Sequence, residues 1–212
     1  MTPSARGAAA GRRLAAAVLH TAWRLRVLGA WRVPAQGPVI LAVNHTHNVD
    51  GPVLMAASPR PVHFLVKREA FAGPLGTFLR GIGQVPVDRA AADRTAVTTA
   101  LGVLASGGVL GIFPEGTRTT GDFATLRPGL AYFAVRSGAP VVPVAVLGGD
   151  RRGGLIRPLP PLRARIDVVF GEPVTAADGG GGRTRTEIRA ASVRLKHRLA
   201  GHLRQARQTT GR

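Results

Sequence analysis

Short apolar runs recur along the middle of this chain, and stretches with helical periodicity separate them. Several runs are apolar at nearly every position, as expected of strands that helices cover on both faces. This alternation predicts an α/β fold: one domain with a largely parallel, mixed sheet flanked by helices. The predicted strands are Val39–Val43, Val62–Val66, Gln84–Val87, Val109–Phe113, Val141–Leu147 and Arg165–Phe170. The predicted helices are Pro52–Ala57, Glu69–Arg80, Ala90–Ser106 and Pro128–Ser137.

Residues 11–30 show a different pattern, an apolar stripe with arginines around it, which predicts an amphipathic N-terminal helix. The stripe consists of Leu14, Val18, Ala22, Leu25 and Leu28. A helix of this kind lies in a lipid headgroup layer or packs on its own domain, and the two are compatible.

We therefore divide the chain into three segments. Residues 1–34 are expected to form the membrane-associating helix and residues 35–178 the α/β domain. Residues 179–212 hold a linker of four glycines followed by a basic helix over about 183–207.

The formal charge of +18 indicates an anionic partner, although an arginine-rich composition also follows from a GC-rich genome. Only Lys67 and Lys196 are lysines, so arginine carries nearly all of the charge. A basic nucleic-acid-binding protein is a remote alternative, because aromatic residues for base stacking make up only 5%. No apolar run reaches the roughly 18–20 residues of a membrane span. We expect a peripheral protein on the cytoplasmic face of the cell membrane, bound to its anionic surface.

The segment from Asn44 to Pro52 carries the most specific chemistry. It places a histidine, His45, five residues before an aspartate, Asp50, between a predicted strand and a predicted helix. A strand or an ideal helix would point these two side chains away from each other, whereas a tight turn brings them together. An imidazole oriented by a carboxylate is a common general base. The alternative is that Asp50 only caps the following helix.

Three further segments stand out: Gly83–Arg89, Phe113–Thr119 and Val142–Val146. Each has a plain structural interpretation when taken alone. Asp88 and Arg89 form a surface ion pair, and Pro143 lies in an edge strand or a core strand. The absence of cysteine excludes disulfides, thiolate catalysis and Cys-based zinc sites.

In this order and spacing the four segments resemble the glycerophospholipid acyltransferase family, that of the 1-acylglycerol-3-phosphate acyltransferases. The family blocks are Asn-His-x4-Asp, a Gly…Arg block, Phe-Pro-Glu-Gly-Thr-Arg and a Val-Pro-Val block, and the match covers residues 38–147, about half the chain. The resemblance implies that His45 takes a proton from an acceptor hydroxyl while Asp50 holds its ring. The residues implied in binding the acceptor are Lys67, Arg89, Glu115, Gly116, Thr117 and Arg118.

The resemblance also implies the substrates: an acyl thioester, acyl-CoA or acyl carrier protein, and a lysophospholipid such as lysophosphatidic acid. Glycerol 3-phosphate, another lysophospholipid and a lyso-aminolipid are alternative acceptors. No cofactor is expected, and no metal, because His45 and His47 lack a clear third ligand group. His47 replaces the serine that the family often has there, and is either a turn residue or a second titrating group that alters acceptor choice.

Overall fold

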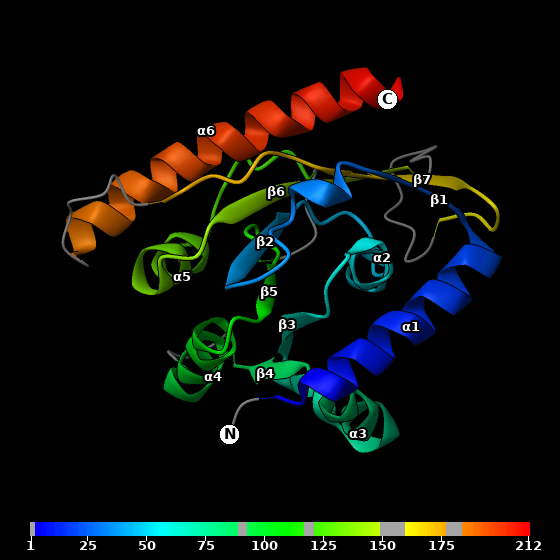
Figure 1. Ribbon diagram of the computed structural model, residues 1–212, viewed down its shortest axis with the longest axis horizontal. Coiled ribbons are helices and arrows are strands. Elements are labelled where there is room, and N and C mark those ends of the chain that lie inside the picture. The colour runs from blue at the N-terminus through cyan, green and yellow to red at the C-terminus, as the bar shows by residue number, and fades with distance from the viewer. Residues whose placement is uncertain (1–2, 89–92, 117–120, 149–159, 177–183) are drawn as a thin grey trace.

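The computed structural model describes residues 3–88, 93–116, 121–148, 160–176 and 184–212. Its centre is a seven-stranded sheet in the order β1-β7-β6-β2-β5-β3-β4, with helices on both faces (Figure 1). The strands are β1 Arg24–Leu28, β2 Val39–Val43, β3 Val62–Lys67, β4 Val85–Val87, β5 Val109–Ile112, β6 Val141–Gly148 and β7 Arg165–Phe170. The α-helices are α1 Ala5–Ala22, α2 Asp50–Ala57, α3 Gly73–Gly81, α4 Arg94–Ala105, α5 Gly129–Ser137 and α6 Arg185–Thr210. Two 3-10 turns, η1 Ala30–Arg32 and η2 Arg68–Phe71, complete the described elements.

The predicted fold class is confirmed. Strand β2 lies at the middle of the sheet, between β5 and β6, and pairs with both in parallel. All five of its residues are buried, which explains its unbroken apolar sequence. The sheet is mixed because β7 runs antiparallel to β6, while β1 runs parallel to β7. Pro143 lies in the interior strand β6, so the edge-strand alternative for it is wrong.

Apolar side chains form one layer on each face of the sheet. One layer packs against α1 and α2 and includes Leu19, Val53 and Leu54. The other packs against α4, α5 and α6 and includes Leu104 and Leu130. Each such side chain contributes about 1.5–3 kcal/mol when fully buried. The two layers hold the sheet rigidly, and with it the strand ends from which the site is built.

The N-terminal prediction is correct for the first part of its helix and wrong for the rest. Helix α1 ends at Ala22, and the next residues form the edge strand β1, which pairs with β7. The sequence Arg-Leu-Arg-Val-Leu over residues 24–28 alternates in polarity, a period of two that fits a strand. The boundary expected at residues 34 and 35 therefore places one strand of the sheet outside the α/β domain.

Helix α1 packs on its own domain mainly through residues outside the predicted stripe, of which only Ala22 contacts the core from this helix. Its buried positions are Ala8, Gly11 and Leu19, and it lies against α2. Leu14 and Val18 remain 50% and 53% exposed. The predicted packing on the domain is thus present, and two members of the predicted stripe face outward.

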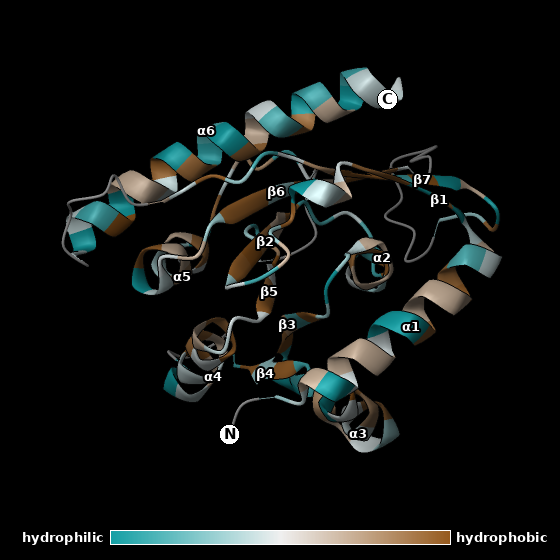
Figure 2. Ribbon diagram, in the orientation of Figure 1, coloured by the Kyte–Doolittle hydropathy of each residue, from teal (hydrophilic) through white to brown (hydrophobic). Residues whose placement is uncertain are grey.

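The basic C-terminal helix is confirmed as α6, which crosses the sheet on the side of α5 (Figure 1). Leu195, Leu199 and Leu203 face the core, while hydrophilic residues recur along its length (Figure 2). The glycine linker at residues 179–182 lies outside the described residues. Within the described chain, every helix is too short or too polar to cross a lipid bilayer.

Candidate active site

The site begins where β2 ends, and an asparagine fixes that end. The side chain of Asn44 donates to the carbonyl of Val146 at 3.0 Å and accepts from its amide at 2.7 Å. Asn44 is buried, and this pair of bonds prolongs the contact between β2 and β6 by one residue. The chain therefore leaves the sheet at His45 from a fixed position.

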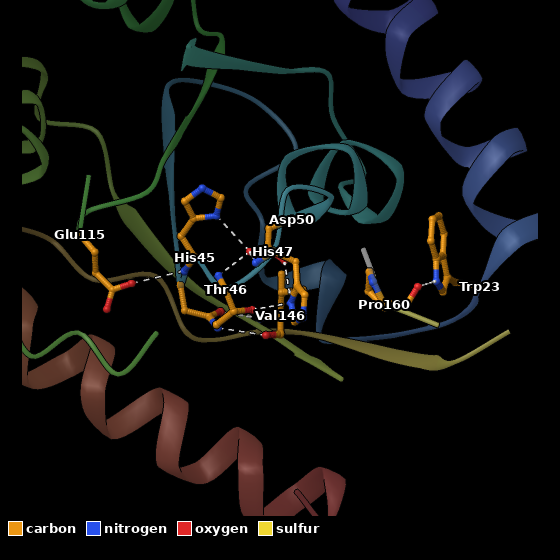
Figure 3. A network of polar contacts seen from close by, with 9 residues as sticks. Trp23, His45, Thr46, His47, Asp50, Glu115, Val146 and Pro160 are labelled. Atoms are coloured by element: carbon orange, nitrogen blue, oxygen red, sulfur yellow. Dashed lines mark hydrogen bonds and ion pairs between the residues drawn. The ribbon is translucent and has the colours of Figure 1, made fainter. Parts of the chain in front are cut away.

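Asp50 organises the turn between β2 and α2 (Figure 3). One oxygen of its carboxylate, Oδ2, accepts from the amides of Thr46 and His47 at 2.6 and 2.7 Å. The same oxygen lies 3.0 Å from Nδ1 of His45. The expected contact across the turn is present. The alternative that Asp50 caps α2 does not describe this geometry, because its oxygen accepts from amides before the helix.

The arrangement of His45 suits proton transfer. A carboxylate at Nδ1 favours the tautomer with the proton on Nδ1, which leaves a lone pair on Nε2. The imidazole is 20% exposed, whereas Asp50 is 1% exposed. The ring of Phe113 stacks on the imidazole, with centroids 4.2 Å apart. The ring is therefore fixed on two sides and open to a substrate on another.

Glu115, which the resemblance implies in binding the acceptor, contacts two other segments of the protein. Its two carboxylate oxygens accept from backbone amides, one from His45 at 3.4 Å and one from Phe123 at 2.9 Å. The residue is buried, and it is not among the described residues that line the two cavities beside the site. Its contacts are those of a group that joins the catalytic turn to the segment after β5, rather than of one that faces the acceptor.

A cavity of about 630 Å³ opens beside His45. Its wall is mostly apolar, and Lys67 is exposed at its margin. The larger apolar side chains of this lining are Met55, Phe64, Leu65, Val66, Leu75, Phe78, Leu79, Ile82 and Phe113. A largely apolar cavity with one imidazole at its wall fits a ligand that is a hydrocarbon chain with a reactive polar end.

A second cavity, of about 420 Å³, lies on the other side of Phe113 and Leu65, which line both. Gly116 and Arg127 lie along it, and so does Asp88. Gly116 has φ +73°, and a Cβ there would overlap the side chain of Arg127. The positive φ favours glycine at this position, and any larger residue would also displace the side chain of Arg127.

Three predicted substrate-binding residues, Arg89, Thr117 and Arg118, lie outside the described residues. Their chain neighbours Asp88 and Gly116 both line the second cavity. Arg127 was not predictable from the sequence, because nothing in its local pattern separates it from the other arginines of the chain. Only the folded chain places it against Gly116.

His47 is buried, and its Nδ1 lies 2.8 Å from the hydroxyl of Thr46 and 3.9 Å from Asp50. It is absent from the described lining of both cavities. This position agrees with the interpretation of His47 as a hydrogen-bonding residue of the turn. The Val142–Val146 block is a buried part of β6, as its interpretation as a core strand predicts.

Fold and site together define a class: an α/β enzyme with a histidine-carboxylate pair at the carboxyl end of a central strand. The sequence pattern of the acyltransferase family matches residues 24–147, well over half of the chain. The chain belongs to this family and is an acyltransferase.

Individual relatives agree with this assignment. The chain is 29% identical over 177 residues to the 1-acyl-sn-glycerol-3-phosphate acyltransferase of Bacillus subtilis, covering 82% of this chain and 86% of that protein. It is similar in structure to the 1-acyl-sn-glycerophosphate acyltransferase PlsC of Thermotoga maritima, with a TM-score of 0.64 and 25% identity over 94% of this chain and 78% of the other. It is also 30% identical to an uncharacterised protein of Mycobacterium tuberculosis, about half of whose length it spans.

Proposed function

We propose that this protein transfers a fatty acyl group from an acyl thioester to the hydroxyl of lysophosphatidic acid, giving phosphatidic acid. The observation that carries the proposal is the 3.0 Å contact between His45 Nδ1 and Asp50 at the wall of an apolar cavity. The names of the relatives from Bacillus subtilis and Thermotoga maritima support the acceptor. Acyl-CoA and acyl carrier protein are the two candidate donors.

His45 acts as the general base in this proposal. Its Nε2 takes the proton of the acceptor hydroxyl as that oxygen attacks the thioester carbonyl carbon. The tetrahedral intermediate then expels the thiolate, which receives the proton back from the imidazolium. Asp50 keeps the ring in its reactive tautomer and stabilises the imidazolium between the two steps. The ester, the free thiol and the original form of His45 result, without an acyl-enzyme.

The two cavities suggest how the substrates are arranged. The 630 Å³ cavity, with His45 in its wall, would hold an acyl chain. The 420 Å³ cavity would receive the glycerol phosphate, because Arg127 lines it together with Asp88 and Gly116, which directly precede Arg89 and Thr117 in the sequence. Guanidinium groups bind phosphate through paired hydrogen bonds. Lys67, at the margin of the larger cavity, is a further cation for the phosphate or the donor.

Other acceptors keep the same chemistry and remain the second candidate: glycerol 3-phosphate, another lysophospholipid or a lyso-aminolipid. We propose that the protein acts as a peripheral protein at the cytoplasmic face of the cell membrane, where donor and acceptor meet. A panel of these acceptors with acyl-CoA, with products identified by mass, distinguishes them. Phosphatidic acid as the main product supports the proposal, and acylation of a different acceptor alone replaces it with the second candidate.

His45→Ala provides the test of the base. We expect turnover to fall by about 10²–10⁴-fold, the usual contribution of general base catalysis. The matched control is His197→Ala, an exposed histidine on α6, which should retain its activity. Circular dichroism and thermal unfolding of both variants establish that they are folded. A folded His45→Ala variant with near-normal turnover would rule out the proposed base.

A further inference from the structure

The imidazole of His45 is held at one edge and covered on one face. Oδ2 of Asp50 lies 3.0 Å from its Nδ1 (Figure 3). This contact alone leaves the ring free to tilt, because the last torsion of a histidine side chain has broad minima. The face of the ring is covered by Phe113, whose centroid lies 4.2 Å away at an interplanar angle of 29°. Phe113 therefore limits the tilt that Asp50 leaves open.

Phe113 is itself in contact with a second aromatic ring. The centroid of Phe64 lies 5.6 Å from that of Phe113, and the two ring planes are 13° from parallel. This separation is within the range of roughly 4.5–7 Å in which offset aromatic pairs attract each other. Phe64 is buried, whereas Phe113 directly follows β5 and is half-buried. The ring that covers the imidazole is therefore supported by a ring of the core.

The backbone of Phe64 is fixed by both neighbours of β3 in the sheet. On one side its register partner is Gly111 of β5. On the other side its amide donates at 2.8 Å to the side-chain oxygen of Gln84, a buried residue just before β4. The side-chain nitrogen of Gln84 donates to the carbonyl of Ile82, also at 2.8 Å. These contacts hold Phe64 at a defined place beside the catalytic turn.

Gly111 leaves the space that the Phe64 ring occupies. A Cβ on Gly111 would overlap three atoms of that ring, Cδ1, Cε1 and Cζ. Gly111 does not have a positive φ, so its backbone conformation would accept other residues. Glycine inside a strand weakens it and often marks the close approach of another group. The close approach of Phe64 is therefore the local requirement for glycine at this position.

We infer that Phe64 and Gly111 are positioning residues: the Phe64 ring, in the space left by Gly111, holds Phe113 against the imidazole of His45. In the described part of the chain, the ring that stacks on this imidazole is that of Phe113 alone. Phe64 therefore acts on His45 through Phe113. The inference rests on the proposed function for the role of His45 as the base. A displacement of about 1 Å in a reacting group can lower the rate about 10²-fold, so this support matters for turnover.

Phe64 and Phe113 also line the cavity beside His45, so the loss of a ring could act on substrate binding instead. The two effects differ in their kinetics. Loss of positioning lowers kcat, because the reacting groups are misaligned in the bound complex, whereas loss of an apolar wall raises KM. Leucine in place of Phe64 keeps the wall apolar and removes the ring.

The first test compares Phe64→Leu with Phe170→Leu. Phe170 lies on β7, is buried in the same apolar layer as Phe64, and is absent from the described lining of the cavities beside the site. Both variants lose a ring from the core, and thermal unfolding measures how much stability each loses. We expect Phe64→Leu to lower kcat about tenfold with a smaller change in KM. Phe170→Leu should keep kcat near its original value.

Gly111→Ala tests the same path without removing a ring. Its methyl group displaces the Phe64 ring, so we expect kcat to fall about tenfold. In the Phe64→Leu background there is no ring to displace. The double variant should therefore be little slower than Phe64→Leu alone, a departure from additivity that two independent losses of stability do not produce. Fully additive losses of kcat would overturn the assigned path.

A spectroscopic measurement follows the imidazole without any substrate. Protons above the face of an aromatic ring resonate upfield, so the ring protons of His45 should resonate upfield of those of the exposed His197. The His45→Ala variant identifies the resonance in the proton NMR spectrum of histidine-labelled protein. It should move in Phe64→Leu and Gly111→Ala, and stay in place in Phe170→Leu.

Either an unmoved His45 resonance or an unchanged kcat in a folded Phe64→Leu variant overturns the inference. The kinetics use whichever acceptor the panel identifies, so a product other than phosphatidic acid corrects the proposed acceptor alone. Near-normal turnover in His45→Ala refutes the proposed base instead. That result is distinct from a failure of this inference, because the variant leaves Phe64 and Phe113 in place.

Discussion

Two buried aspartates of this protein have opposite surroundings. Asp50 is 1% exposed, and its Oδ2 accepts from two backbone amides and faces the His45 ring. Asp167 on β7 is fully buried and faces three guanidinium groups, those of Arg26, Arg165 and Arg212. The nearest nitrogens of these arginines are 2.6, 3.2 and 3.5 Å from its oxygens.

The difference shows what separates a catalytic carboxylate from a structural one. The partners of Asp50 in the turn are two backbone amides and the imidazoles of His45 and His47, rather than guanidinium groups, so its negative charge remains to stabilise an imidazolium. The charge of Asp167 is more than balanced by three cations. Its partners are Arg26 on the edge strand β1, Arg165 on the neighbouring strand β7 and Arg212 just after α6, so it joins these two strands to the segment that follows α6. Burial alone does not distinguish the two roles, whereas the charge of the partners does.

Asp50→Asn should produce the largest effect on catalysis. The oxygen of asparagine would take the place of Oδ2, because two backbone amides donate to that position, but it carries no charge to stabilise an imidazolium at His45. We expect kcat to fall about 10²–10⁴-fold with a much smaller change in KM for the acceptor. Steady-state kinetics with lysophosphatidic acid measures both. If the variant keeps kcat near its original value, Asp50 is not a catalytic carboxylate and its contrast with Asp167 does not hold.

Asp167→Asn should have the converse effect, on stability and not on turnover. Losing the carboxylate leaves three guanidinium groups without their shared anion, but each arginine is partly exposed and regains water. We expect the free energy of unfolding to fall by about 1–3 kcal/mol, with kcat unchanged. Urea unfolding and kinetics on the same preparation test this. A large fall in kcat at unchanged stability would mean that Asp167 acts on the site.

A smaller effect, on the pH dependence of stability, should arise from His202, whose partner Val169 lies on the same strand as Asp167. His202 on α6 donates from Nε2 to the carbonyl of Val169 at 2.9 Å, and burial lowers its pKa from the usual 6.5. Between the lowered pKa and 6.5 the unfolded chain binds the proton more readily, so stability is lost as pH falls below about 6.5. Unfolding curves from pH 8 to pH 5 should show this slope, and His202→Gln should reduce it. An unchanged slope in the variant would assign the pH dependence to another group.

The strands β2 to β7 were predictable because each is a short apolar run with turn residues at its ends. The contact of His45 with Asp50 was predictable for a related reason. Only a turn lets residues five apart meet, and the flanking strand and helix require that turn. In both cases the relevant interactions are local, or depend only on whether a segment is buried.

The secondary structure of the N-terminal segment was harder to predict, because the positions of Leu25 and Leu28 fit the spacing of a helix as well as an extended strand. Pairing with β7, which lies about 140 residues later in the chain, decides for the strand. An edge strand gains most of its hydrogen bonds from its neighbour, and no local pattern reports that neighbour. The contacts of Glu115 were not predictable for the same reason, since its amide partners belong to two other segments.

The amino-acid sequence by itself determined the central strands, the turn with its histidine and aspartate, and the acyltransferase family. The tertiary structure alone decided that β1 belongs to the sheet, that Asp167 gathers three distant arginines and that Arg127 lies against Gly116. It also decided that Phe113 lies against both His45 and Phe64. Periodicity and short spacings encode contacts within a few residues, whereas contacts across a hundred residues depend on how all elements pack together.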